Sequence, residues 1–349
     1  MSAKKPTMEQ WQRAYSLAAE VYALAPWKWM PETAYLGFSD PKGISPHFIS
    51  ILGQLGEHFA IAVYRRVEDL FLIIDDLVGP DAKPEVILET SQLQLSFEDR
   101  DYLRPEDRRV IKALKLSFRG RHAWPCFRSL LPGQFPWHVN SEELSMLTLA
   151  LEHVLAVTPR FKDDKKELGR LVILGLKENV FLMRIQRSQD SNSEWWESMV
   201  EFERLAEPEI IPELDEKLLE HTKCLPIAKN KIEVDIRLMP DPVQDRSGER
   251  PYFPFIMLAV EQASGFIVGH EVMRPKPTLD AVYQRAAGEL LGMLAKQEER
   301  PGKIYVRTEK MASLLRSLCE KLDIRLTVRT PLRQTERAFA LMERTAARN

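Results

Sequence analysis

The sequence predicts an α+β fold, with an N-terminal α+β domain followed by a mixed α/β C-terminal domain. The chain has 349 residues, more than a typical single domain, and its 44% hydrophobic and 29% charged residues are the balance of an ordinary globular protein. In the first half of the chain, some stretches have apolar residues at strand spacing and others at helix spacing. Beyond residue 231, an apolar hairpin is followed by helices and strands in alternation.

The N-terminal part begins with an amphipathic helix. Thr7 and Gln10 form a capping-box pattern, and an apolar stripe at helical spacing continues to Pro26. Three short strands, a helix, a further strand and a second helix are predicted next, at 34–38, 47–52, 57–64, 67–77, 93–97 and 105–114. Glycines between the short strands favour turns, so we expect a small antiparallel sheet.

A second long helix follows a segment rich in arginine, proline and aromatic residues. Ser141 is its predicted N-cap, Glu142 and Glu143 form an acidic first turn, and the helix ends near Pro159. The charged run FKDDKKELG at 161–169 is interpreted as a solvated linker.

This linker sets the first domain boundary. We therefore expect a domain at 1–160, a connecting segment at 161–230 and a second domain at 231–349. Within the connecting segment, 179–187 is a predicted strand, and Ser193 is expected to cap a helix that carries Trp195, Met199 and Phe202.

The C-terminal part begins with a strictly alternating strand at 231–238. Its polar face carries Glu233, Asp235 and Arg237, and we interpret this face as exposed to solvent. A hairpin follows at 251–273, and its first strand is so apolar that both faces should be buried. Helices and strands then alternate, at 279–294, 304–306, 311–322, 325–328 and 336–345.

This order of hairpin, helix, strand, helix, strand and helix resembles the ribonuclease H-like fold of transposases and integrases. The resemblance implies carboxylates on neighbouring strands that hold two metal ions at a phosphodiester. The candidate catalytic residues are Glu261, at the end of the first hairpin strand, and Glu309, after the next strand, with Glu336 or Glu343 as a third acid. Magnesium is the cofactor of this alternative alone, and no other cofactor or metal site is evident.

A structural interpretation competes with this nuclease alternative, and we favour it. Glu309 stands in the first turn of a helix capped by Thr308, where the helix dipole favours a carboxylate without any catalytic role. The hairpin strand also ends in Glu261 where the fold's enzymes are expected to carry an aspartate. The C-terminal domain is therefore expected to lack a complete metal site.

The segment Phe118–Val139 contains three arginines, two tryptophans, three phenylalanines and three prolines. The candidate binding residues are Arg119, Arg121, Trp124, Phe127, Arg128 and Trp137. They could grip phosphates and stack bases, or form an exposed anchor patch for a protein partner. The third interpretation, which we favour, is that the aromatic side chains fill the core while the arginines satisfy carbonyls or carboxylates.

The charge, the cysteines and the lengths of the apolar runs argue against several classes of protein. A formal charge of −2 argues against a generally basic nucleic-acid binder, although a local basic patch stays open. The three cysteines, Cys126, Cys224 and Cys319, are too far apart to predict a disulfide framework or a zinc site. No apolar run reaches the roughly 18 residues of a membrane span, and no leader is evident. We expect a cytoplasmic binding protein that has no membrane partner and no complete catalytic motif.

Several stretches resemble a bacterial family of unknown function. They are APWKWM at 25–30, LGQLGEHFAIAVY at 52–64, SQLQLSFEDRDYL at 91–103 and FRGRHAWPCFRSLLPGQFPW at 118–137. Similar sequences often continue as YRGxxGL where this chain has Tyr64 to Glu68. The C-terminal stretches 250–269, 300–307 and 322–332 resemble a second such family, which commonly accompanies the first. The resemblance implies a two-part cytoplasmic bacterial protein and brings no substrate or catalytic residues.

Overall fold

The computed structural model describes residues 4–40, 45–79, 84–186, 195–204, 210 and 212–346, apart from the side chains at 84, 85, 343, 345 and 346. The chain forms two compact units. The first comprises Met1–Leu131 with Pro136–Leu205, and the second comprises Pro132–Phe135 with Ala206–Asn349. The first unit thus extends past the boundary expected at residue 160, because the strands formed by 180–201 belong to its sheet.

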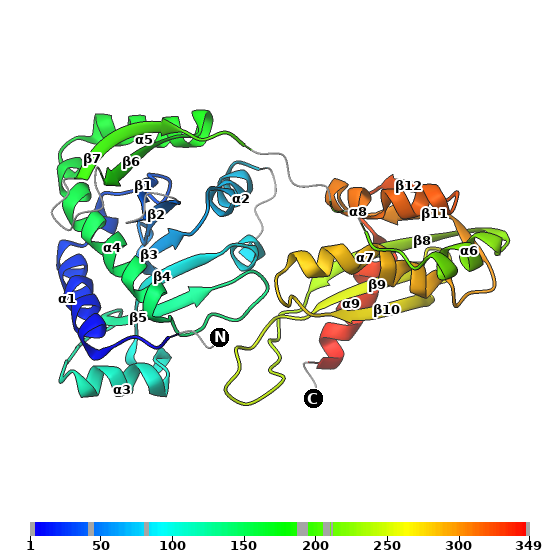
Figure 1. Ribbon diagram of the computed structural model, residues 1–349, viewed down its shortest axis with the longest axis horizontal. Coiled ribbons are helices and arrows are strands. Elements are labelled where there is room, and N and C mark those ends of the chain that lie inside the picture. The colour runs from blue at the N-terminus through cyan, green and yellow to red at the C-terminus, as the bar shows by residue number, and fades with distance from the viewer. Residues whose placement is uncertain are drawn as a thin grey trace. The chain divides into compact units, whose positions relative to one another are not determined.

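The first unit is built on a seven-stranded sheet with the order β5-β4-β3-β2-β1-β6-β7 (Figure 1). Its strands are β1 (Leu36–Ser39), β2 (Pro46–Leu52), β3 (Phe59–Tyr64), β4 (Gln92–Glu98), β5 (Trp124–Leu130), β6 (Val180–Gln186) and β7 (Trp195–Glu201). Neighbouring strands are antiparallel except for β1 and β6, which are parallel. The small antiparallel sheet expected from the sequence is therefore the centre of a larger mixed sheet.

Five α-helices accompany this sheet in the described part of the chain. They are α1 (Met8–Leu24), α2 (Val67–Val78), α3 (Pro105–Ala113), α4 (Ser141–Val157) and α5 (Lys165–Glu178). Short 3-10 helices lie at Pro26–Lys28, Pro84–Glu89, Arg100–Tyr102 and Thr158–Lys162.

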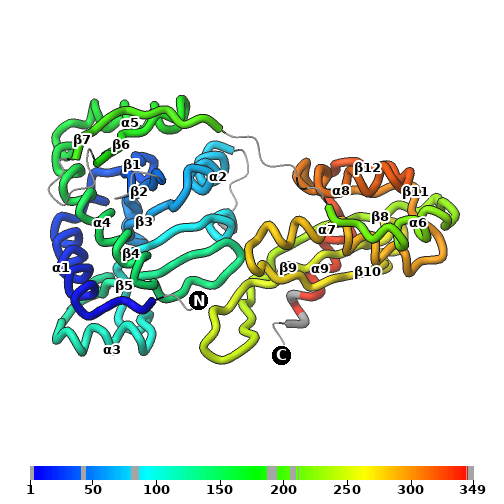
Figure 2. Tube along the Cα trace, viewed as in Figure 1, coloured from blue at the N-terminus to red at the C-terminus, as the bar shows by residue number. Residues whose placement is uncertain are grey.

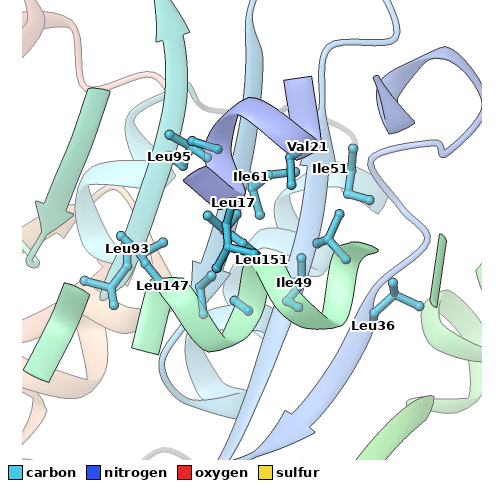
Figure 3. Close-up of a cluster of buried hydrophobic side chains, with 14 of the residues drawn as sticks. Leu17, Val21, Leu36, Ile49, Ile51, Ile61, Leu93, Leu95, Leu147 and Leu151 are labelled. Carbon is cyan, nitrogen blue, oxygen red and sulfur yellow. The ribbon is translucent and has the colours of Figure 1, made fainter. Parts of the chain in front are cut away.

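The main core lies between α1, α4 and one face of the sheet. Figure 3 shows Leu17 and Val21 of α1 and Leu147 and Leu151 of α4 against leucine and isoleucine side chains of the strands. Burial of each such side chain contributes about 1.5–3 kcal/mol, so this layer holds the two helices on the sheet. On the other face, α2 packs through Leu70, Phe71 and Ile74 against a second cluster.

Helix caps explain where two of these helices begin. The predicted capping box of Thr7 and Gln10 is confirmed at α1. At α4 the N-cap is Asn140 rather than the expected Ser141: its side chain accepts hydrogen bonds from the backbone N–H groups of Glu142 and Glu143, and the Glu143 carboxylate accepts from the Asn140 N–H. Asn140 is the cap because its side-chain carbonyl oxygen accepts from two N–H groups of the first turn that have no partner within the helix.

Two predictions for the connecting segment are wrong. The run at 161–169 is not a linker, because α5 begins at Lys165 and both Phe161 and Leu168 are buried while the charged residues face outward. The segment from Trp195 onward is the strand β7, paired with β6, and not a helix. Trp195, Met199 and Phe202 have helical spacing, but pairing with an existing sheet edge overrides that local pattern. Ser193 lies outside the described residues.

The second unit is built on a five-stranded sheet with the order β10-β9-β8-β11-β12. Its strands are β8 (Ile227–Leu238), β9 (Phe255–Glu261), β10 (Ile267–Met273), β11 (Arg300–Val306) and β12 (Arg325–Val328). Strand β9 is antiparallel to both of its neighbours, β8 and β10, whereas β11 is parallel to β8 and β12 is parallel to β11. The helices are α6 (Glu216–Cys224), α7 (Asp280–Leu294), α8 (Glu309–Lys321) and α9 (Arg333–Ala346).

Helices cover both faces of this second sheet. Side chains of α7 and α8 form one core with β8, β9 and β11, while Phe339 of α9 packs on Leu258 and Val260 at the opposite face. Both faces of β9 are thus buried, and the alternation of helices and strands is as predicted. The expected solvent-exposed face of β8 is wrong: Glu233 is 1% exposed and Asp235 is 2% exposed.

Candidate functional site

The segment Phe118–Val139 contains an edge strand that the sequence analysis did not predict. Strand β5 pairs along its whole length with β4, from Gln92 opposite Leu130 to Glu98 opposite Trp124. Its proline, Pro125, and its arginine, Arg128, interrupt any alternation of apolar and polar residues, and six of its seven residues are buried. The strand therefore gives no periodic signal in the sequence.

Two of the six candidate binding residues are buried within the first unit. Phe127 lies edge-on to Trp11 at 5.5 Å and to Tyr15 at 5.2 Å between ring centroids. Arg128 is 6% exposed, and its Nη1 and Nη2 donate to Oδ1 and Oδ2 of Asp107 at 2.9 and 2.6 Å. Burial alone would lower the pKa of Arg128, but its hydrogen bonds to Asp107 raise it. Both residues therefore act in the fold.

The two tryptophans of the set are half-buried and lie beneath arginines of the same chain. The Trp124 ring meets Phe118 edge-on at 5.7 Å, and the Arg100 guanidinium lies 5.9 Å from its centroid. The Arg104 guanidinium lies 5.1 Å from the Trp137 ring. These cation–π contacts leave each tryptophan only partly accessible.

The remaining candidates, Arg119 and Arg121, are exposed on the turn that precedes β5. Arg121 lies 3.8 Å from Asp99, a loose ion pair. The six candidates consequently occupy three environments, and the surface can use at most four of them.

The candidate catalytic acids lie at element ends in the second unit. Glu261 ends β9, and its carboxylate accepts a hydrogen bond from Ser264 in the following turn. Glu309 is the exposed first residue of α8, beyond the Thr308 cap that accepts from the Met311 N–H. Among the residues that the structure describes, no three His, Cys, Asp or Glu side chains are grouped so that they could hold a metal ion. The side chain of Glu343 lies outside the described set.

A different acidic cluster, on the buried face of β8, was missed from the sequence. Oδ2 of Asp235 accepts hydrogen bonds from Nε of Arg237 at 2.9 Å and from Nε and Nη2 of Arg307 at 3.0 and 2.8 Å. Nη1 of Arg307 also reaches Oε1 of Glu336 at 3.3 Å. Burial raises the pKa of Asp235, and the charge of Arg307 opposes the rise. The carboxylate is thus held by two guanidinium groups.

The neighbouring acid, Glu233, binds a helix N-terminus. Its Oε2 accepts from the backbone N–H groups of Gln334 and Thr335 at 2.8 and 3.1 Å, in the first turn of α9. A carboxylate is favoured there by the orphan N–H groups and the helix dipole. Glu233 therefore attaches α9 directly to the centre of the sheet, and Arg307, which binds both Asp235 and Glu336 of α9, adds a second link.

One signal in the sequence could have indicated this burial. A strand placed in the middle of a sheet with helices on both faces has no solvent-exposed side, so its acids must find partners. The alternating pattern alone does not show which helix covers the polar face.

In a comparison with known proteins, both parts of the chain match family models. Residues 11–183 match the model described as Domain of unknown function (DUF7309), and residues 218–343 match that described as Domain of unknown function (DUF6930). The chain carries two adjoining domains of unknown function. The resemblance to two adjoining uncharacterised families is therefore confirmed. The DUF7309 match runs from α1 to β6, and the DUF6930 match runs from α6 to α9.

Other comparisons add little to these two families. No curated protein matches the chain. A solved structure of the simian T-cell lymphotropic virus intasome in complex with the PP2A regulatory subunit B56 gamma is similar at 18% identity over 32% of this chain and 38% of that chain, with a TM-score of 0.22. Similarity at this level carries no inference about fold or function. No helix in the described residues is long and apolar enough to cross a membrane.

Proposed function

We propose that this chain is a binding protein without a catalytic site of its own, and that its second unit is a ribonuclease H-like module in which arginine neutralises the buried Asp235. Three antiparallel strands followed by two strands parallel to the first, with helices on both faces, support the fold assignment. The family matches bring no substrate and no catalytic residues to either unit.

The hydrogen bonds of Asp235 carry this proposal. Two-metal phosphodiester chemistry needs carboxylate oxygens on neighbouring strands that are available to bind cations. Here Oδ2 of Asp235 accepts three hydrogen bonds from Arg237 and Arg307, and Oδ1 accepts the Ile236 N–H. The residue that follows β11, the strand next to β8, is Arg307 itself. An arginine therefore supplies the positive charge that a metal ion would otherwise bring to Asp235.

A cleavage assay tests this proposal. The full chain, with Asp235→Asn and Glu309→Gln as separate variants, is incubated with single-stranded and duplex DNA and RNA in Mg²⁺ or Mn²⁺. We expect no metal-dependent cleavage by any of the three proteins and no saturable heat when Mn²⁺ is titrated into the wild type. Cleavage that is lost in Asp235→Asn would overturn the proposal. Cleavage lost in Glu309→Gln would instead support the alternative nuclease that uses Glu261 and Glu309.

We also propose a cytoplasmic setting for this bacterial-type protein. Cys126 and Cys319 are free, buried thiols, and burial raises the pKa of each to about 12. Such thiols are weak nucleophiles, and reduced cysteines suit a reducing compartment.

A further inference from the structure

The connection between β4 and β5, Asp99–Ala123, concentrates positive charge. It contains eight basic and four acidic residues, a net charge of +4 in a chain whose formal charge is −2. Six of the eight basic residues are arginines. A local excess of this size sets the connection apart from the otherwise acidic chain.

These basic residues gather at one end of the first unit. Strands β4 and β5 are adjacent and antiparallel, and Glu98 pairs with Trp124. The connection therefore leaves β4 and enters β5 at the same end of the two strands. Figure 2 traces it through α3. At about 100° per helical residue, Arg108, Arg109 and Lys112 fall within one arc of about 100° on the exposed side of α3.

The acidic residues of the connection neutralise only part of this charge. Asp107 is buried in its ion pair with β5. Glu106 pairs with Arg109 at 2.9 Å, and Asp99 lies 3.8 Å from Arg121. Three of the four acids are thus already occupied.

Four exposed cations remain: Arg108, Lys112, Lys115 and Arg119. None of them has an ion-pair partner in the part of the chain that the structure describes. Exposed cations without internal partners are the groups that phosphates can neutralise with release of counterions.

Among the polyanions that this positive charge could bind, the residue types of the connection favour single-stranded nucleic acid. Arginine matches phosphate oxygens in a bidentate fork, and bases stack on accessible aromatic rings. Tyr102, which lies between Arg100 and Arg104 in the sequence, is 65% exposed, and Trp124 is half-buried beneath Arg100. Among the exposed large apolar side chains of the described residues, Tyr102 is the one in this connection, and it is aromatic rather than aliphatic. An aliphatic anchor for a lipid surface is thus missing from this patch.

We propose that the connection Asp99–Ala123 is a binding surface for single-stranded nucleic acid, with Arg108, Lys112, Lys115 and Arg119 on phosphates and Tyr102 stacked on a base. This inference rests on the proposed binding function and names its ligand. It uses none of the buried acids of the second unit.

The test is fluorescence anisotropy of the full chain with a labelled oligouridylate or oligothymidylate in EDTA. With four phosphates neutralised, log Kobs should fall with log salt at a slope of about −3 between roughly 50 and 200 mM salt. The triple variant Arg108→Gln, Lys112→Gln, Arg119→Gln should bind about tenfold more weakly or worse, with a slope smaller by about 2. Tyr102→Ala should weaken single-strand binding about tenfold and leave duplex binding unchanged.

A matched control separates this surface from non-specific attraction. The triple variant Lys165→Gln, Lys166→Gln, Lys177→Gln removes the same charge from exposed lysines of α5. It should keep affinity within about twofold of the wild type, since distant exposed charges are screened.

The inference would be overturned by an absence of salt-sensitive binding, by equal weakening in both triple variants, or by binding to anionic lipid vesicles without binding to oligonucleotides. Duplex bound more tightly than single strand, with no effect of Tyr102→Ala, would also overturn it. Because EDTA removes divalent metals, each of these failures is distinct from a failure of the cleavage assay.

Discussion

Arg119 and Arg128 carry the same side chain nine positions apart and lie in opposite environments. Arg119 is exposed on a turn, whereas Arg128 forms a two-point ion pair with the buried Asp107. Losing one partner of such a pair leaves a buried charge, which typically costs about 3–5 kcal/mol. The sequence offers both arginines as phosphate ligands, and the partner from α3 decides that only Arg119 is available for binding.

His153 of α4 illustrates a buried histidine that is held neutral. Its Nδ1 accepts from Nη1 of Arg184 at 2.9 Å, and its ring lies 4.4 Å from Trp195. Burial, and then the charge of Arg184, lowers its pKa to about 3. The native state therefore binds fewer protons at this site than the unfolded state, whose histidine titrates near pH ~6.5.

The free energy of unfolding should consequently rise with pH from about pH 3 to about pH 6.5 and be flat for this group above that range. Within that window the slope due to His153 approaches about 1.4 kcal/mol per pH unit. Urea denaturation across the window should show this slope in the wild type and a smaller one in His153→Gln. His221→Gln, at an exposed histidine, is the control. Parallel curves for the wild type and His153→Gln would contradict the assignment.

At the scale of elements, the predictions of helices and strands succeeded where the apolar residues follow a single helical or strand period. The helices α1, α2, α4, α7, α8 and α9 carry apolar residues at helical spacing, and their ends are marked by caps or prolines. Strand β5 and strand β7 lie at the two edges of the first sheet, and their local patterns predicted no strand. Pairing with a neighbouring strand, as β5 pairs with β4 and β7 with β6, stabilises such strands independently of their own periodicity.

The C-terminus of α3 allows a prediction that separates stability from binding. Lys115 has φ +55°, a left-handed conformation in which glycine is the favoured residue after a helix. Lys115→Gly should therefore stabilise the first unit by about 1 kcal/mol in chemical denaturation. Because it also removes an unpaired cation, it should weaken oligonucleotide binding at the same time.

The comparison variant lies inside α3. Arg109→Gly, within α3, should destabilise the unit by about 1 kcal/mol, since glycine disfavours a helix interior. If Lys115→Gly proves equally destabilising, the left-handed geometry at this position does not limit stability.

At the scale of the whole molecule, unit membership does not follow the chain. Pro132–Phe135 belongs to the second unit although it lies inside the DUF7309 match. The Phe135 N–H donates to the Pro251 carbonyl at 2.9 Å, and the Phe253 N–H donates to that of Gly133 at 2.9 Å. Gly133 has φ +68°, and a Cβ there would lie 2.6 Å from Pro275, so glycine is required. A boundary drawn on composition alone misses this insertion.

Hydrogen exchange tests the membership of that short segment. Leu315→Ala opens a cavity in the core under α8 and should cost about 2–5 kcal/mol in the second unit. Amide exchange should then accelerate for residues 212–346 and for Phe135. The amides of Ser129 and Trp137, which pair with each other in the first unit, should be unaffected. Unchanged exchange at Phe135 would show that it unfolds with the first unit.

The sequence by itself determined the fold class, most of the periodic elements, the family pair and the excess of charge between β4 and β5. These properties are local, because periodicity, caps and composition depend on residues within a few turns of one another. The tertiary structure alone decided which charged side chains are buried. Asp235 meets Arg307, 72 positions away, only because β8 and β11 are neighbours, and Arg128 meets Asp107 only because α3 lies beside β5. Burial of a charge depends on the element that covers it and on the partner that this element provides. The residues adjacent in the sequence determine neither of them.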